Sequence, residues 1–127
     1  MKIENQVTNL QLSKRLKELK VKQESCFYWS KAMDNKFWRI ENSQFFAVDE
    51  RRDVSAFTVA ELGEILPHQI KTGEGNLWQL NTIKINGWTW GVSYESGDHS
   101  HILQSEIGDT EADARAKTLI SLLKIIN

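Results

Sequence analysis

The sequence predicts an α+β protein with an antiparallel sheet and helices packed on one face, in the order α-β-β-β-α-β-β-β-α. Three segments carry helix caps followed by apolar residues at helical spacing, and the stretches between them change to the alternating period of strands. No strand–helix–strand stretch has the continuous Val/Ile runs of a buried parallel sheet. The 127 residues fit one domain, residues 1–127, that is long enough to bury a core.

The first helix is expected to begin after Thr8, which forms a capping-box pattern with Gln11. Leucines then recur at helical spacing and give one apolar stripe that runs through about residue 19: Leu12, Leu16 and Leu19. This segment is therefore predicted to bury one face only.

Three short aromatic or β-branched segments follow and are predicted as strands: residues 25–31 (SCFYWSK), 36–40 (KFWRI) and 44–48 (QFFAV). The residues between them, AMDN and ENS, are typical of turns. Residues 49–55 (DERRDVS) are expected to form a charged loop between the two halves of the chain.

The second helix repeats the capping pattern. Thr58 is the expected cap, Glu61 can reach back to it, and Pro67 ends the helix because proline cannot continue the hydrogen-bond ladder. Its buried side is predicted to comprise Val59, Leu62, Ile65 and Leu66. Residues 71–76 (KTGEGN) then read as a loop with two glycines.

The clearest hairpin is predicted at Asn86-Gly87, the dipeptide that type I′ turns prefer because both positions need positive φ. That turn would place four large side chains on one face of the ribbon: Ile83, Ile85, Trp88 and Trp90. Residues 99–106 are expected to add a third antiparallel strand.

The last helix is predicted over residues 110–127, beginning at Thr110 with acidic residues in its first turn. One of its faces is small and apolar, formed by Ala112, Ala116, Leu119, Ile120 and Leu123. The Trp/Ile face of the hairpin needs a cover, and this helix is expected to supply it, so that Trp88 and Trp90 belong to the core.

The composition indicates a soluble cytoplasmic chain that does not enter a membrane. No apolar run approaches the ~20 residues that span a bilayer, and the first residues lack the apolar stretch of a secretory signal. The single cysteine, Cys26, cannot form an internal disulfide, which suits a reducing compartment, and it is expected to be buried and inert.

The net charge of −1 hides an asymmetry between the two ends of the chain. Residues 1–40 carry nine Lys/Arg and four Asp/Glu, whereas residues 41–127 carry seven and thirteen. Much of the positive charge falls on the first predicted helix, at Lys14, Arg15, Lys17 and Lys20. A cationic helix is either a solvated face or a surface for nucleic acid or an acidic partner, and nucleic-acid binding is therefore the alternative function.

A weak metal-site pattern occurs at His99 and His101, because residues two apart in a strand point the same way. A third ligand would have to come from elsewhere, from His68 or Glu95, and polar residues at a loop edge explain the pattern more simply. No catalytic motif or phosphate loop is present, so the sequence predicts no catalytic residue, no cofactor and, in all, no enzyme.

Several stretches resemble a family of small, functionally uncharacterised proteins encoded by phages and prophages of gut bacteria. These are LSKRLKELKVKQESCFYW near the start, TVAELGEILP at residues 58–67, the strand ending in GVSYES, and the closing TEADARAKTLISLL. The resemblance implies a mobile-element origin and a compact single domain in the host-cell cytoplasm. It implies no activity, substrate or site residue.

Together these observations predict a non-enzymatic accessory protein that binds a protein partner or itself. The last helix has apolar residues that fall off its main stripe: Leu122, Ile125 and Ile126. A helix that is apolar on more than one face is deeply buried or covers the remainder with a second subunit. The sequence therefore predicts a homodimer interface at these three positions.

Overall fold

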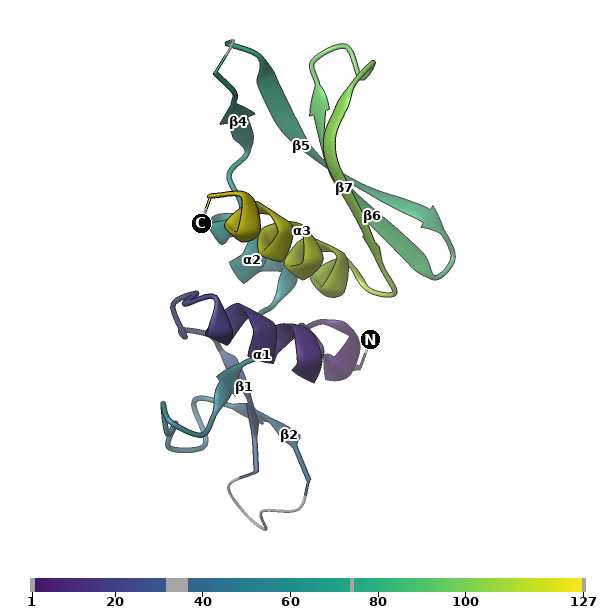
Figure 1. Cartoon of the computed structure of the whole chain (residues 1–127). Helices are drawn as coiled ribbons and strands as arrows, with labels where there is room; N and C mark the ends of the chain where they lie inside the picture. The colour runs from purple at the N-terminus through teal and green to yellow at the C-terminus, as the bar shows by residue number, and fades with distance from the viewer. Residues whose placement is uncertain (1, 32–36, 74, 127) are drawn as a thin grey trace.

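A large and a small antiparallel sheet, separated by helices, make up this computed structural model, which confirms the α+β class (Figure 1). The structure describes residues 2–31, 37–73 and 75–126, apart from the side chain of Ile126. Helix α1 (Leu10–Glu18) lies beside the small sheet. Helix α3 (Glu111–Ile126) lies between α1 and the large sheet, with α2 (Val59–Ile65) packed against it. The strands therefore form two sheets on opposite sides of a helical layer, rather than the single sheet that the sequence predicts.

Helix α1 follows a short 3₁₀ turn, η1 (Ile3–Asn5), and is capped by Asn9 rather than Thr8. The Asn9 Oδ1 atom accepts a hydrogen bond of 2.9 Å from the Leu12 amide. Thr8 is instead fully buried, where its hydroxyl lies 2.6 Å from Ser13 Oγ and accepts a bond from the Phe57 amide. The predicted cap is thus wrong by one residue, because tertiary contacts draw the Thr8 hydroxyl into the interior.

The small sheet consists of β1 (Phe27–Ser30), β2 (Arg39–Asn42) and β3 (Val54–Ser55), in the order β2-β1-β3. The first two strands fall within or next to predicted ones, although part of the predicted strand 36–40 lies outside the described residues. Residues 44–48, predicted as the third strand, form none.

The third strand instead comes from the segment predicted as a charged loop. Asp53, just before β3, is 1% exposed and accepts bonds from the Asp49 amide at 2.8 Å and from Arg52 Nε at 2.9 Å. The ammonium group of Lys17 donates to the carbonyls of Glu50 and Asp53 at 2.9 and 2.8 Å. The charged loop is therefore anchored by the burial of one carboxylate, which brings β3 alongside β1.

Helix α2 has the capping box that the sequence predicts. The Thr58 hydroxyl accepts a bond from the Glu61 amide, and the Glu61 carboxylate accepts one from the Thr58 amide, at 3.1 and 2.9 Å. The helix ends at Ile65, two residues before Pro67. Local side-chain chemistry thus sets both ends of this helix.

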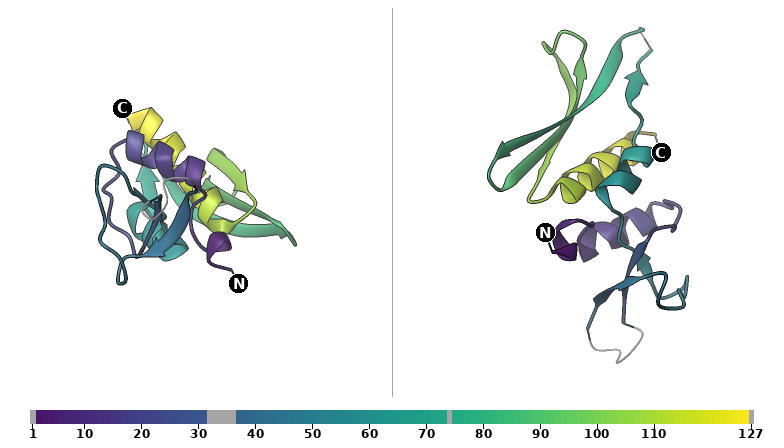
Figure 2. Two further views of the ribbon diagram at one scale, coloured as in Figure 1. Left: turned by 90° about the horizontal axis from the view of Figure 1, so that it is seen from below. Right: turned by 180° about the vertical axis from the view of Figure 1, so that it is seen from behind.

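The large sheet has four strands in the order β4-β5-β6-β7. Their bounds are β4 (Gln69–Lys71), β5 (Leu77–Asn86), β6 (Thr89–Ser96) and β7 (Ile102–Gly108). The short edge strand β4 was not predicted, whereas the three-strand meander was. As Figure 2 shows, helix α3 lies on one face of this sheet, which we call the inner face, and leaves the outer face uncovered.

The β5–β6 hairpin has a different register from the predicted one. Lys84 pairs with Trp90 and Asn86 pairs with Thr89, with a shift between them, so the turn residues are Gly87 and Trp88. Neither Asn86 nor Gly87 has positive φ. Asn86 Oδ1 accepts a 2.9 Å bond from the Trp88 amide, and this side-chain turn replaces the predicted type I′ turn.

The shifted register reverses the predicted packing of the hairpin. Ile83, Ile85 and Trp88 are 51%, 52% and 79% exposed, so helix α3 does not cover them. Trp90 is half-buried on the inner face. The prediction that all four side chains form one covered face is therefore wrong for three of them.

The core lies where the inner face of the large sheet meets α3. Tyr94 of β6 is fully buried and packs with residues of all three helices: Leu16, Leu62, Ala116, Leu119 and Ile120. Burial raises the pKa of Tyr94 to about 12, and its hydroxyl donates to the Pro67 carbonyl at 2.7 Å. Within the described part of the chain, no helix has the length and apolar character needed to cross a membrane.

Candidate functional site

An apolar uncovered surface lies on the outer face of the large sheet, around Gly91. A β-carbon at Gly91 would lie 3.1 Å from Ile85 Cδ1 and 3.7 Å from Ile83 Cγ1, so both isoleucines fold over this glycine. Ile107 of β7 pairs with Gly91 from the other side and is 56% exposed. We call Ile83, Ile85 and Ile107 the outer patch.

Polar residues adjoin the outer patch on the same face. Asn81 and Ser93 pair across β5 and β6, and both donate to the Glu95 carboxylate. These bonds, from Ser93 first and then Asn81, lower the pKa of Glu95. The outer patch is thus bordered by a carboxylate that its neighbours keep charged.

A groove of about 800 Å³ runs between the β5–β6 turn and the starts of α2 and α3. Its lining includes Val59, Ala60, Lys84, Trp88, Trp90 and Asp109. The Lys84 ammonium nitrogen lies 5.7 Å from the centroid of the Trp90 ring, which is within cation–π range. The groove therefore combines indole surface with charges of both signs.

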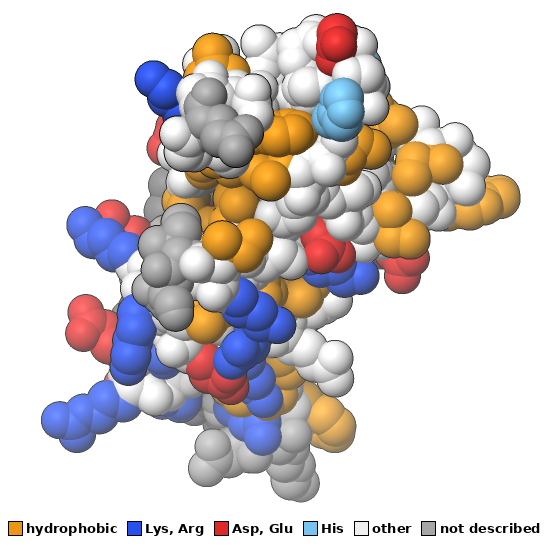
Figure 3. Space-filling view, turned by 45° about the horizontal axis from the view of Figure 1, so that its top comes forward, with side chains coloured by type: hydrophobic (Ala, Val, Ile, Leu, Met, Phe, Trp, Pro, Cys, Tyr) orange, Lys and Arg blue, Asp and Glu red, His pale blue; other side chains and the backbone are white. Residues whose placement is uncertain are grey.

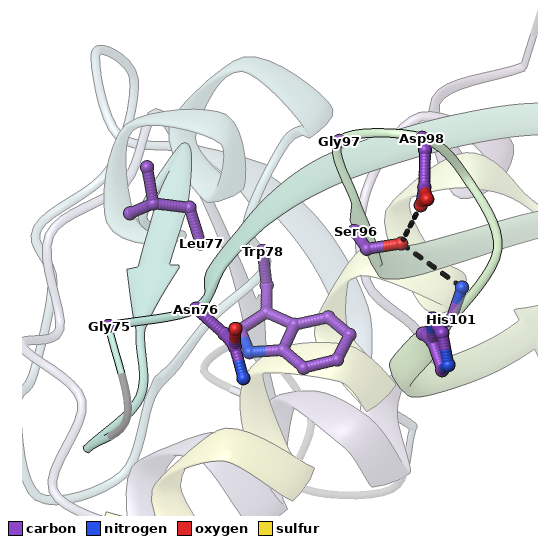
Figure 4. A pocket seen from close by; sticks show the side chains of 8 residues that line it. All are labelled: Gly75, Asn76, Leu77, Trp78, Ser96, Gly97, Asp98 and His101. Atoms are coloured by element: carbon purple, nitrogen blue, oxygen red, sulfur yellow. Dashed lines mark hydrogen bonds between the residues drawn. The ribbon is translucent and has the colours of Figure 1, made fainter.

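A second hollow, of about 550 Å³, lies at the opposite end of the large sheet (Figure 4). The Trp78 indole lies on the side of the β6–β7 turn, whereas the Leu77 side chain points away from that turn. In the turn, the Ser96 hydroxyl bonds to Asp98 and to the His101 amide. Hydrogen bonds from Ser100 and then Ser96 hold the pKa of Asp98 far below its usual value.

This hollow does not hold a catalytic triad. The Ser100 hydroxyl lies 2.7 Å from Asp98 Oδ1 and 2.7 Å from His101 Nδ1, so the serine stands between the acid and the imidazole. In a triad the imidazole stands between the other two, because it takes the serine proton while the acid orients it. The bonds seen here stabilise a turn instead.

The predicted metal ligands are not brought together. His99 has φ +61° and lies in the turn, where its Nδ1 atom is 3.6 Å from Glu95 Oε1. His101 lines the hollow with Trp78, on the opposite side of the sheet from Glu95. Among the residues that the structure describes, no three His, Cys, Asp or Glu side chains are grouped so that they could hold a metal ion.

Some of the basic residues of α1 form ion pairs or hydrogen bonds within the protein. Figure 3 shows Lys and Arg side chains gathered over the half of the molecule that contains α1 and the small sheet. Arg15 pairs with Glu18 at 3.0 Å, and Lys17 holds the loop before β3. Lys14 lies 4.8 Å from the centroid of the Trp38 ring, and Lys20 has φ +70° at the end of the helix.

Trp38 receives a second cation, because Lys31 lies 5.3 Å from the same ring centroid. Trp38, Trp78 and Trp90 are half-buried, whereas Trp88, which the sequence predicts in the core, is mostly exposed.

The three residues of the predicted interface on α3 differ in their exposure to solvent. Leu122 is 6% exposed and belongs to the core of its own chain, so it is not available to a partner. Ile125 is 72% exposed, and the side chain of Ile126 lies outside the described residues. Cys26, expected to be buried, is exposed.

Ile107 is the site residue that the sequence reasoning did not single out. Its neighbours Glu106 and Gly108 belong to the inner face, where Glu106 accepts a bond from Ser121 and Gly108 meets α3. The alternation of residues along this strand therefore places Ile107 on the outer face. The alternation is visible in the sequence, but only the position of α3 shows which side of β7 is the uncovered one.

Comparison of the chain with protein-family models, with curated proteins and with solved structures gives no match.

Proposed function

We propose that this protein is a non-enzymatic interaction module that pairs with a second copy of itself through the outer patch. The observation that carries the proposal is that Ile83, Ile85 and Ile107 lie together on an uncovered sheet face, each more than half exposed. Contiguous exposed apolar groups of this kind typically mark interaction sites. A flat sheet face can be covered by another sheet, with side chains of the two faces interdigitating.

The charges around the patch favour a second copy as the occupant. Beside the Gly91–Ile107 pair, the next outward-facing pair on β6 and β7 is Ser93 with Ser105, and neither is charged. The nearest carboxylate on β6, that of Glu95, is four residues from Gly91. A two-fold axis through the patch would therefore bring isoleucines together without juxtaposing like charges. The charged carboxylate of Glu95 beside the patch makes this part of the face unsuited to a phosphate backbone.

Sedimentation velocity over a wide range of protein concentration tests this proposal, with two matched substitutions. Ile83→Lys places a charge in the patch and is expected to weaken dimerisation at least tenfold. Ile125→Lys makes the same change at an exposed residue on α3, outside the patch, and is expected to leave it unchanged. A protein that stays monomeric at every concentration, or a dimer that only Ile125→Lys dissociates, would refute the proposal.

The setting of this association is part of the same proposal. The resemblance to small phage and prophage proteins suggests an accessory protein that acts in the cytoplasm of a host cell. It supplies no partner, so the oligomeric state is the property to measure first.

A second candidate function, nucleic-acid binding, is favoured by the arrangement at Trp38. Lys14 and Lys31 approach one indole ring from α1 and from the end of β1, and single-strand binding sites combine cations with aromatic rings in this way. Fluorescence anisotropy with a labelled oligothymidine would show affinity that falls with salt and with Lys14→Glu. The matched control is Lys71→Glu on β4, and equal effects of the two substitutions would refute the candidate.

A further inference from the structure

We propose that the groove between the β5–β6 turn and the start of α3 binds an arginine side chain of a partner protein. This site is distinct from the outer patch, because its lining comes from the inner face of the sheet, from the hairpin turn and from the helix starts. Neither Ile83, Ile85 nor Ile107 lines it. The inference therefore goes beyond self-association.

The indoles provide the first part of the argument. Trp88 is 79% exposed at the turn, and a side chain of this size rarely remains so open on a surface without a partner. Trp90 lies next to it in the groove and already carries a cation, the Lys84 ammonium group. The face of that ring is thus accessible to a positive charge, and Lys84 occupies the place that an incoming cation would take.

The charge of Asp109 provides the second part. Its exposed carboxylate forms no hydrogen bond and no ion pair with any residue in the described part of the chain. Glu111, which also lines the groove, differs in this respect, because its Oε2 atom accepts a 2.9 Å bond from Arg115. The α3 dipole favours an acidic residue at this position, but the dipole does not account for the indoles beside it.

Arginine fits these groups better than lysine or a neutral side chain. Its guanidinium plane stacks on an indole and is weakly hydrated, and its fork of donors can bond a carboxylate in two places. Val59 and Ala60, at the start of α2, provide apolar contacts for the aliphatic stem. Lys84 is exposed, so its ammonium group can move into solvent when the guanidinium arrives.

The test uses three capped pentapeptides that differ only at the central residue, Gly-Ala-Arg-Ala-Gly and its lysine and citrulline analogues. Each is titrated into ¹⁵N-labelled protein while the indole and backbone resonances are followed. The arginine peptide is expected to shift the Trp88 and Trp90 indole signals and to bind at least severalfold more tightly than the lysine peptide. The citrulline peptide, which lacks the charge, is expected not to bind.

Two pairs of substitutions separate a specific site from general attraction between charges. Asp109→Asn is expected to weaken arginine binding about tenfold, and Glu64→Gln, at an exposed acid on α2, is expected to leave it unchanged. Lys84→Gln should strengthen binding, because the Trp90 face is vacated, whereas Lys71→Gln should not. Equal effects within either pair, equal binding of the citrulline peptide, or shifts away from Trp88 and Trp90 would overturn the proposal.

The result does not depend on dimerisation. Repeating the titration with Ile83→Lys gives the same expected binding, since Ile83 does not line the groove. A protein that fails to self-associate but binds the arginine peptide would refute the proposed function and support the groove.

Discussion

Gly108 and Ala114 approach so closely that a β-carbon at position 108 would lie 2.6 Å from the Ala114 backbone nitrogen. This contact sets the distance between the end of β7 and the first turns of α3. Ala112, Ala114 and Ala116 are fully buried there, so small side chains on the helix and a glycine on the strand permit the same close approach. This close approach lets α3 lie directly against the inner face of the sheet at the end of β7.

The first prediction is that Gly108→Ala destabilises the fold. The obstructing atoms belong to the backbone of α3 and cannot move aside as a flexible side chain could. We expect a loss of about 2 kcal/mol in the free energy of unfolding, in the range seen for overpacked cores. Urea denaturation measures it, and Gly97→Ala is the control, because a β-carbon there meets nothing within 4 Å. Equal stability of the two variants would contradict the close contact.

The second prediction concerns Glu61. Its carboxylate accepts bonds from the Thr58 amide and the Ser25 hydroxyl through one oxygen, and from the Cys26 amide through the other, at 2.7 to 2.9 Å. It therefore joins the start of α2 to the start of β1. Glu61→Ala should cost about 2 kcal/mol, more than loss of a cap alone. Glu64→Ala, on the exposed side of the same helix, should change stability by less than about 0.5 kcal/mol; similar losses would disprove the role of Glu61.

The third prediction is that Lys20→Gly stabilises the protein. Lys20 follows the end of α1 with φ +70°, and the Lys20 and Val21 amides bond to the Lys17 and Leu16 carbonyls in a Schellman motif. A non-glycine residue is strained in this conformation, so glycine should raise the free energy of unfolding by about 0.5–1 kcal/mol.

Gln11→Gly is the opposite control, because glycine inside a helix is unfavourable by about 1 kcal/mol. Thermal and urea unfolding of both variants measure the two effects. A destabilised Lys20→Gly variant would show that the lysine side chain contributes more than the strain costs.

The fourth prediction concerns acid stability and Asp53. Burial alone would raise the pKa of this carboxyl, but hydrogen bonds from Arg52, the Asp49 amide and Ser30 outweigh burial and lower it. A carboxyl whose pKa is lower in the folded than in the unfolded state stabilises the protein at pH values above its unfolded pKa of 3.8. This contribution is lost as the pH falls through the folded pKa.

Asp53→Asn should therefore be less stable than the parent protein at pH 7, and the difference should shrink as the pH approaches 3. Urea unfolding of both proteins across that pH range measures the difference in their free energies of unfolding. The other carboxylates are the same in both proteins, so their effect cancels in the difference. A difference that does not vary with pH would show that the charge of Asp53 is unimportant.

Local signals in the sequence were sufficient where a helix end depends on nearby side chains. The Thr58–Glu61 box is confirmed, and the Thr110 hydroxyl accepts a 3.1 Å bond from the Asp113 amide at the start of α3. The Asp113 carboxylate, however, also reaches the Asn9 amide at 2.9 Å, beyond its own helix end. That choice of partner depends on α1, which is distant in the sequence.

The hairpin shows how a small local choice can reverse a prediction. Asn86-Gly87 suits a type I′ turn, but Asn86 can also accept a bond from an amide two residues on, and it does so here. Because side chains alternate along a strand, a shift of one position moves a side chain to the other face. Ile83 and Ile85 consequently form the outer patch, and Trp88 enters the turn.

The sequence by itself determined the α+β class, the three helices and the meander, since capping groups and apolar periodicity act between neighbours in the chain. Tertiary structure decided the division of the strands into two sheets. The hairpin register followed from a local choice at Asn86, between two turns that the sequence permits equally. The small sheet is placed by contacts between distant segments, such as the bond from the Phe57 amide to the buried Thr8 hydroxyl and the bond from Lys17 to the Asp53 carbonyl. The spacing of residues in the sequence does not show which distant segments come into contact. The outer patch and the groove are surfaces that these contacts leave exposed.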